Sequence, residues 1–158
     1  MFDRLLKMLG LRKDPPRPNA PDPLQTLSAL QADIVGKVPS LVSSRVDRIV
    51  VTIRETVPRL DQLGPGSSSA HAVIRTATTY LPDAVGSYLR LPRSYADNRP
   101  VRGGKTSLMV LCDQLDLLAN RMDQVFVAVC AADADALVAH GQFLQEKFGH
   151  GSLALEGS

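Results

Sequence analysis

The chain has 158 residues, 44% of them hydrophobic, and a formal net charge of only +2. This length allows one domain with a core of its own, and so small a net charge does not point to nucleic acid as a partner. Tryptophan is absent and only 3 Tyr and 4 Phe occur, which argues against a platform on which single-stranded nucleic acid stacks. The 2 cysteines fit neither a disulfide-dense scaffold nor a cysteine-rich zinc site.

Residues 1–13 are predicted to form a short amphipathic, basic helix. Its charges begin before any apolar run reaches the length of a signal-peptide core, and no later stretch is long enough for a membrane span, so we expect a cytoplasmic protein. A helix of three turns is marginal in water, and we expect this one to order only on binding. The apolar stripe consists of Phe2, Leu5, Leu6 and Leu9, and the cations around it include Arg4 and Lys7.

Residues 14–23 contain five prolines in ten positions, which is incompatible with a helix or a central strand. We expect an extended, semi-rigid linker here. A helical bundle domain is predicted over residues 24–148, followed by a flexible tail over residues 149–158.

The bundle domain shows helical spacing of apolar residues from one end to the other. Residues 24–60 predict one long helix with kinks near Pro39 and Pro58, and residues 68–89 predict a shorter helix that Pro82 bends. The strongest periodicity follows Thr106, a favourable cap residue, and runs to about Phe148.

Residues 91–104 contain Pro92, Pro100, Gly103 and Gly104 and are interpreted as an irregular connection. No run alternates between apolar and polar residues, so we predict no sheet. The expected fold is all-α, an up-down-up three-helix bundle with long first and third helices, or a four-helix variant if the first helix folds back at Pro39. In the three-helix form, an extended 14-residue connection reaches up to about 46 Å, which is enough to return from the end of the short helix to the start of the third helix.

The small net charge hides a dipolar distribution along the chain. Residues 1–18 carry +3, residues 90–105 carry +4 and residues 106–158 carry −5. In an up-down-up bundle the N-terminal segment and the 90–105 connection lie at one end, forming a single basic pole. Such a pole suits the anionic inner face of a membrane or an acidic protein partner, although a solvated surface is the simpler interpretation. The predicted contacts are Phe2, Arg4, Leu5, Leu6, Lys7, Leu9, Arg93, Arg99, Arg102 and Lys105.

The sequence Gly103-Gly104-Lys105-Thr106 resembles the end of a phosphate-binding P-loop and precedes a helix. The first glycine of that pattern would fall at position 99, where Arg99 stands, and no strand is predicted before it, so the motif does not indicate nucleotide hydrolysis. A weaker hypothesis is that a phosphate or carboxylate binds at this helix start. Its ligands would be Arg99, Arg102, Lys105 and Thr106, whereas the simpler interpretation is helix capping by Thr106.

Other arrangements of reactive residues are absent from the sequence. The three histidines lie on separate segments, and Cys112 and Cys130 are too far apart on one predicted helix to form a disulfide. Asp133 and Asp135 point to different helix faces, so they do not form a carboxylate pair. We therefore predict no catalytic residue, no metal site and no cofactor.

The sequences Tyr80-Leu81-Pro82 and Tyr88-Leu89 lie between two long predicted helices. In this respect the chain resembles the bacterial family of 5-bromo-4-chloroindolyl phosphate hydrolysis proteins, which is associated with resistance to toxic anions. The resemblance implies a membrane-adjacent, stress-linked helical protein and transfers no catalytic residue.

Together these features predict a non-enzymatic helical adaptor or scaffold that docks by its basic pole. One alternative is a small-anion binder or hydrolase acting at the start of the third helix. Another is a soluble assembly subunit that forms a homo-oligomer through the apolar seam of the third helix.

Overall fold

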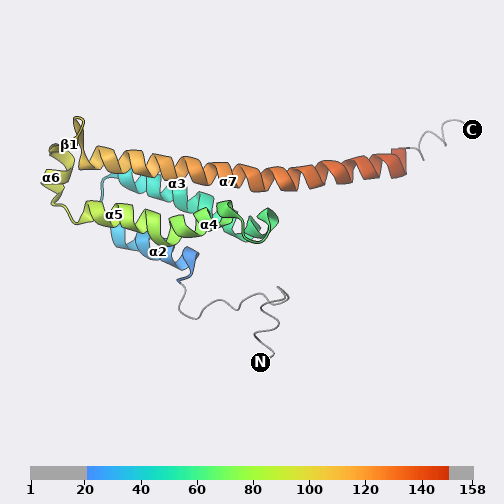
Figure 1. Ribbon diagram of the computed structural model, residues 1–158, viewed down its shortest axis with the longest axis horizontal. Helices are drawn as coiled ribbons and strands as arrows, with labels where there is room; N and C mark the ends of the chain where they lie inside the picture. Colours follow the sequence, from blue (N-terminus) through green and yellow to red (C-terminus); the bar gives the residue numbers. More distant parts are fainter. Residues whose placement is uncertain (1–20, 150–158) are drawn as a thin grey trace, which may run out of the picture.

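The computed structural model describes residues 21–149 and is mainly helical (Figure 1), which confirms the all-α fold class. Six segments are α-helices: α2 (Pro23–Ile34), α3 (Ser40–Thr56), α4 (Ser68–Arg75), α5 (Leu81–Leu89), α6 (Arg93–Asn98) and α7 (Ser107–Leu144). A 3-10 helix covers Val57–Leu63, and π-helical turns cover Thr76–Tyr80 and Gln145–Gly149. Two short strands, β1 (Pro100–Arg102) and β2 (Lys105–Thr106), form a hairpin.

The chain reverses direction between α2 and α3, so residues 24–60 are not the single kinked helix that the apolar spacing predicts. Gly36 adopts a φ of +74°, a conformation that favours glycine, and Pro39 takes an extended conformation just before α3. Arg54, near the end of α3, donates a hydrogen bond of 2.8 Å to Ser28, near the start of α2. The two helices are therefore antiparallel.

The middle helix of the sequence is built from α4, a π-helical turn and α5 in direct succession. Ser67 caps its start by accepting a hydrogen bond from the amide of Ala70. The amide of Leu81 donates to the carbonyl of Thr76, five residues back, immediately before Pro82. The helical turn just before Pro82 therefore contains one extra residue, at the position of the predicted bend. Pro82 itself has no amide hydrogen to donate.

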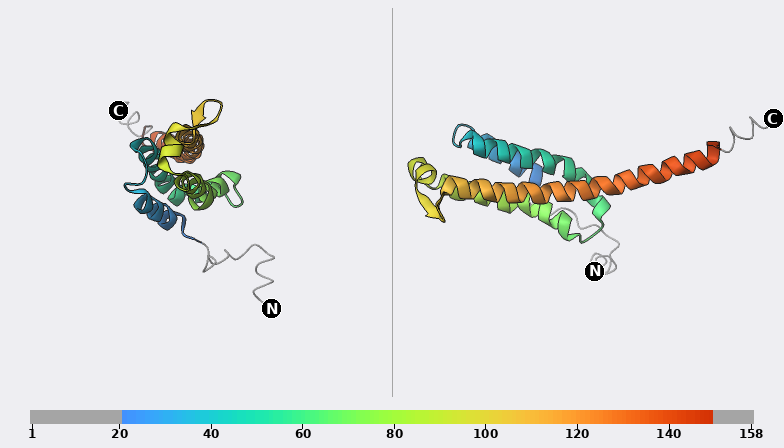
Figure 2. Two further views of the ribbon diagram at one scale, coloured as in Figure 1. Left: turned by 90° about the vertical axis from the view of Figure 1, so that its left-hand side faces the viewer. Right: turned by 90° about the horizontal axis from the view of Figure 1, so that it is seen from above.

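The core lies between α2, α3, α5 and the first half of α7, as the end-on view in Figure 2 shows. The helices α3 and α7 run parallel, because Arg45 pairs with Asp116 at 3.0 Å and Thr52 donates to Asp123 further along. Fully buried side chains from the four helices fill the space between them. The largest are Leu27, Ile49, Ile53, Leu81, Leu115 and Met122.

Residues 91–104 are ordered, which corrects both the expected irregular connection and the expected absence of a sheet. Pro92 precedes α6, and β1 then pairs with β2 in antiparallel register. Gly103 and Gly104 have φ values of +54° and +79°, and this pair of left-handed residues makes a two-residue hairpin turn that matches the strand twist. Because α5 ends where α7 begins, no long extended connection is needed.

The predicted final helix is confirmed, and its second half leaves the bundle. α7 has 38 residues, which corresponds to about 57 Å. Its last buried residue is Val129, and every described residue beyond it is exposed or half-buried. Within residues 21–149, no helix is both long enough and apolar enough to cross a membrane.

The reversal between α2 and α3 also changes where the chain enters the bundle. α2 begins at the end opposite α6 and the hairpin, which is the end from which α7 projects (Figure 1). The expectation that the chain enters beside residues 90–105 is therefore wrong, since it assumed one continuous first helix. Residues 1–18, the other part of the expected basic pole, lie outside the described residues.

Candidate functional site

Cations gather at the end of the bundle where α5, α6, the hairpin and the α2–α3 turn meet. We call this surface the basic end, and all of its cationic side chains belong to exposed residues. They come from four separate segments that the fold brings to one end (Figure 1). The cations are Lys37, Arg90, Arg93, Arg99, Arg102 and Lys105.

Within the described residues, only half of these cations have acidic partners. Lys37 pairs with Asp33 at 3.1 Å, Arg93 pairs with Asp97 at 3.3 Å, and Lys105 pairs with Asp113. The Lys37 and Lys105 pairs are solvent-exposed, so each contributes little to stability and can exchange partners, whereas the side chain of Asp97 is only 25% exposed. The other three cations have no acidic partner within residues 21–149, and they are Arg90, Arg99 and Arg102.

A buried tyrosine fixes α6 against the end of α5. Tyr88 is only 6% exposed and donates a hydrogen bond of 2.7 Å from its hydroxyl to Asp97. Burial, followed by the contact with Asp97, raises the pKa of Tyr88 to about 12, and nearby Arg93 opposes this shift. Asp97 accepts from both Tyr88 and Arg93, so it orients the first arginine of α6.

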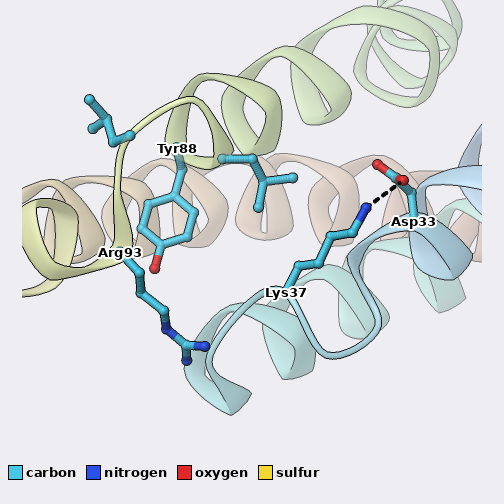
Figure 3. Close-up of a pocket in the computed structure, with 6 residues that line it drawn as sticks. Asp33, Lys37, Tyr88 and Arg93 are labelled. Atoms are coloured by element: carbon cyan, nitrogen blue, oxygen red, sulfur yellow. Dashed lines mark hydrogen bonds and ion pairs between the residues drawn. The ribbon is translucent and has the colours of Figure 1, made fainter.

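A pocket of about 510 Å³ lies between the α2–α3 turn and the α5–α6 junction (Figure 3). Lys37 approaches it from one side, and Tyr88 and Arg93 lie together on the other. Leu89 and Leu91 complete an apolar part of the wall. The pocket therefore combines apolar surface with two cations, of which Lys37 pairs with an exposed carboxylate and Arg93 with the partly buried Asp97.

Apolar side chains protrude among the arginines of the basic end. Leu91 is 37% exposed, Tyr95 is 43% exposed and Val101 is 47% exposed. They lie on the α5–α6 connection, on α6 and on β1 respectively. Because these apolar side chains are exposed beside arginines that have no acidic partner among the described residues, the surface is amphipathic. An end of a bundle that contacts only water has no need of such exposed apolar side chains.

The predicted site residues are thus brought together in part. Arg93, Arg99, Arg102 and Lys105 share the basic end, as the sequence indicates. The hydroxyl of Thr106 caps α7 by accepting from the amide of Met109 at 3.2 Å, and Gly103-Gly104 form the hairpin turn instead of a phosphate loop. The remaining predicted contacts lie outside the described residues, and they are Phe2, Arg4, Leu5, Leu6, Lys7 and Leu9.

Sequence reasoning missed Lys37 and the three exposed apolar residues. The signal for Lys37 was its place between Gly36 and Pro39, since such turns mark the ends of a bundle. Leu91 and Val101 adjoin Pro92 and Pro100, which indicate connections and therefore surface.

The described residues offer little for catalysis. No cluster of three His, Cys, Asp or Glu side chains among them could hold a metal ion. Cys112 is half-buried, and burial raises the pKa of its thiol, which disfavours the nucleophilic thiolate.

Comparison of the chain with protein-family models, curated proteins and solved structures finds no match. The resemblance based on Tyr80-Leu81-Pro82 therefore stays a prediction. In the structure this sequence forms the end of the π-helical turn and the start of α5, and Tyr80 contacts Arg75 through its ring.

Proposed function

We propose that this protein is a non-enzymatic helical adaptor that docks by its basic end on an anionic membrane surface, at the cytoplasmic face. One observation carries the proposal: at one end of the bundle, exposed apolar side chains stand among arginines that have no acidic partner within residues 21–149. The apolar residues can enter the headgroup region while the cations meet lipid phosphates.

The unpaired arginines supply the electrostatic part of this binding. Each cation near an anionic leaflet contributes about 1 kcal/mol, so Arg90, Arg99 and Arg102 together contribute about 3 kcal/mol at moderate salt. Lys37 and Lys105 add to this when lipid phosphates replace their exposed carboxylate partners. Leu91, Tyr95 and Val101 add a term that does not depend on salt.

The shape of the basic end favours a membrane over an acidic protein. The hairpin and the short helix α6 protrude at this end (Figures 1 and 2), and a protruding tip can insert into the headgroup layer. Protein interfaces instead bury broad complementary surfaces.

Flotation with vesicles tests the proposal. Wild-type protein is mixed with neutral or phosphatidylserine-containing vesicles at low and high salt, beside the double variant Arg99→Glu/Arg102→Glu. The matched control, Arg59→Glu/Arg121→Glu, makes the same charge change at exposed positions away from the basic end. The expected result is salt-sensitive binding to anionic vesicles, weakened at least about 30-fold in the first variant and less than about 3-fold in the control.

Equal binding by the two double variants would refute the proposed surface. Absence of binding by all proteins would refute membrane docking and favour the acidic protein partner. The predicted N-terminal contacts are tested separately with Leu5→Asp/Leu6→Asp, which removes the apolar stripe of residues 1–13 and leaves the basic end intact.

A further inference from the structure

The second half of α7 is a helix without a packing partner among residues 21–149. Beyond Val129 it projects from the bundle on its own, as Figure 1 and the right-hand view of Figure 2 show. We call residues 131–148 the extension. Their length corresponds to about 27 Å of helix. Five apolar side chains of this stretch are at least 40% exposed, and they are Leu137, Val138, Phe143, Leu144 and Phe148.

Most of these apolar side chains lie on one face of the extension. The His140 ring stacks on Phe143 at a centroid distance of 6.1 Å, and the ammonium of Lys147 lies 5.5 Å from the Phe143 ring centroid. Leu137 and Leu144 flank this row at helical spacings of three and four. Val138 points to the other side, where Asp135 and Gln142 are among its neighbours.

We propose that the extension pairs with the extension of a second copy of this chain in antiparallel orientation, with the two-fold axis near His140. Asp133 and Lys147 are each seven residues from His140, on opposite sides. Antiparallel pairing about that residue places Asp133 of one copy beside Lys147 of the other. Because the axis repeats every contact, the dimer contains this opposite-charge pair twice.

The same register matches side chains by size. Leu137 and Phe143 are each three residues from His140, so two large apolar side chains meet near the axis. Further out, small Ala136 faces Leu144. Alternation of large and small residues allows two helices to interdigitate without voids.

A second copy fits this face better than other occupants do. The extension carries Asp133, Asp135 and Glu146 against a single Lys147, so an anionic membrane would repel it. A parallel pair would place Asp133 against Asp133 and Lys147 against Lys147. The face is complementary to itself only when the helices run in opposite directions.

One helix face of this length is smaller than a standard protein interface, which buries roughly 1,600 Å² in total. We therefore expect a dissociation constant on the order of 10 μM and a monomer–dimer equilibrium that depends on concentration. The inference does not rest on the proposed membrane docking, because the basic end lies at the opposite end of α7.

Sedimentation of the full chain between about 1 and 200 μM tests the dimer. Leu137→Asp places a charge on the apolar face, whereas the matched control Val138→Asp places it one residue along, on the other side of the helix. Both positions are exposed in the monomer, at 72% and 60%, so neither substitution disturbs the bundle core. Leu137→Asp should weaken dimerisation at least about 100-fold, because both chains of the dimer carry the substitution. The control should weaken it less than about 5-fold.

A charge exchange tests the antiparallel register. Asp133→Lys alone and Lys147→Asp alone each create two like-charge pairs in the proposed dimer, and each should weaken it about 10-fold or more. The double variant Asp133→Lys/Lys147→Asp should restore the wild-type affinity. A monomer at 200 μM would overturn the proposal outright. A dimer that the single substitutions do not weaken would overturn the antiparallel pairing.

Discussion

Replacing Tyr88 with phenylalanine tests how the basic end is held on the bundle. The hydroxyl of Tyr88 donates to Asp97 at 2.7 Å, and Asp97 also accepts from Arg93 at 3.3 Å. A hydrogen bond to a charged acceptor contributes about 1.5–3 kcal/mol. Asp97 keeps its contact with Arg93 in the variant and its side chain is 25% exposed, so we expect the lower limit, a loss of about 1.5 kcal/mol at pH 8.

The pH dependence of this loss has a definite sign. The pKa of Tyr88 is raised to about 12, above the ordinary 10.0, so the folded state holds the phenolic proton more tightly than the unfolded state. This contribution to stability is fully present below pH 10 and is lost as the pH rises through 12. One unit of pKa difference corresponds to about 1.4 kcal/mol, so the wild type should lose about that amount by pH 11 relative to the phenylalanine variant.

The assay is urea unfolding followed by far-ultraviolet circular dichroism at pH 8 and pH 11. Tyr95→Phe is the matched control, because Tyr95 lies on α6, is 43% exposed and makes no side-chain hydrogen bond within the described residues. Wild type and Tyr88→Phe should differ at pH 8 and converge at pH 11. A difference below about 0.5 kcal/mol at pH 8, or one of equal size at both pH values, would refute the role assigned to this hydrogen bond.

Four further substitutions test the bundle by urea unfolding. Leu115→Ala removes a side chain with 0% exposure from the core and should cost about 2–5 kcal/mol, whereas a loss below 1 kcal/mol would contradict the packing of α7 on α3. Thr106→Ala removes the acceptor for the Met109 amide and should cost about 1 kcal/mol; no loss would show that the cap does not stabilise α7. Gly104→Ala should destabilise the fold by about 1 kcal/mol, because the φ of +79° at this position disfavours a side chain. Gly86→Ala should stabilise the fold slightly, because a Cβ at this position in α5 meets open space. If Gly104→Ala were the more stable of the two variants, the hairpin turn would be contradicted.

The long final helix was predictable because local signals agree along its length. Apolar residues recur at spacings of three and four from Leu108 onward, and Thr106 is both a favourable cap residue and the observed one. The break between α2 and α3 was less certain from sequence, because the apolar spacing continues on both sides of it. Only Gly36 and Pro39 signal the reversal, and whether such a pair kinks a helix or ends it depends on the neighbouring helices.

The positive charge of the basic end could be predicted from the sequence, but the full set of residues that form it could not. Arginines crowded into residues 90–105 identify a cationic segment whatever the fold. Lys37 joins them only because α2 and α3 are antiparallel, which places residues more than fifty positions apart beside one pocket. The hairpin escaped detection because its strands are too short to show alternation, although Gly103-Gly104 is itself a two-residue turn signal.

The two proposals together predict that the protein connects two membranes. In an antiparallel dimer the basic ends point in opposite directions and lie about 100 Å apart, because each is about 33 residues of helix from His140. Wild-type protein should therefore cluster anionic vesicles, measured as turbidity and as particle size by light scattering. Leu137→Asp should still float with vesicles but should not cluster them, whereas Arg99→Glu/Arg102→Glu should lose both properties. Clustering by Leu137→Asp at the wild-type level would show that the extension does not link the two surfaces.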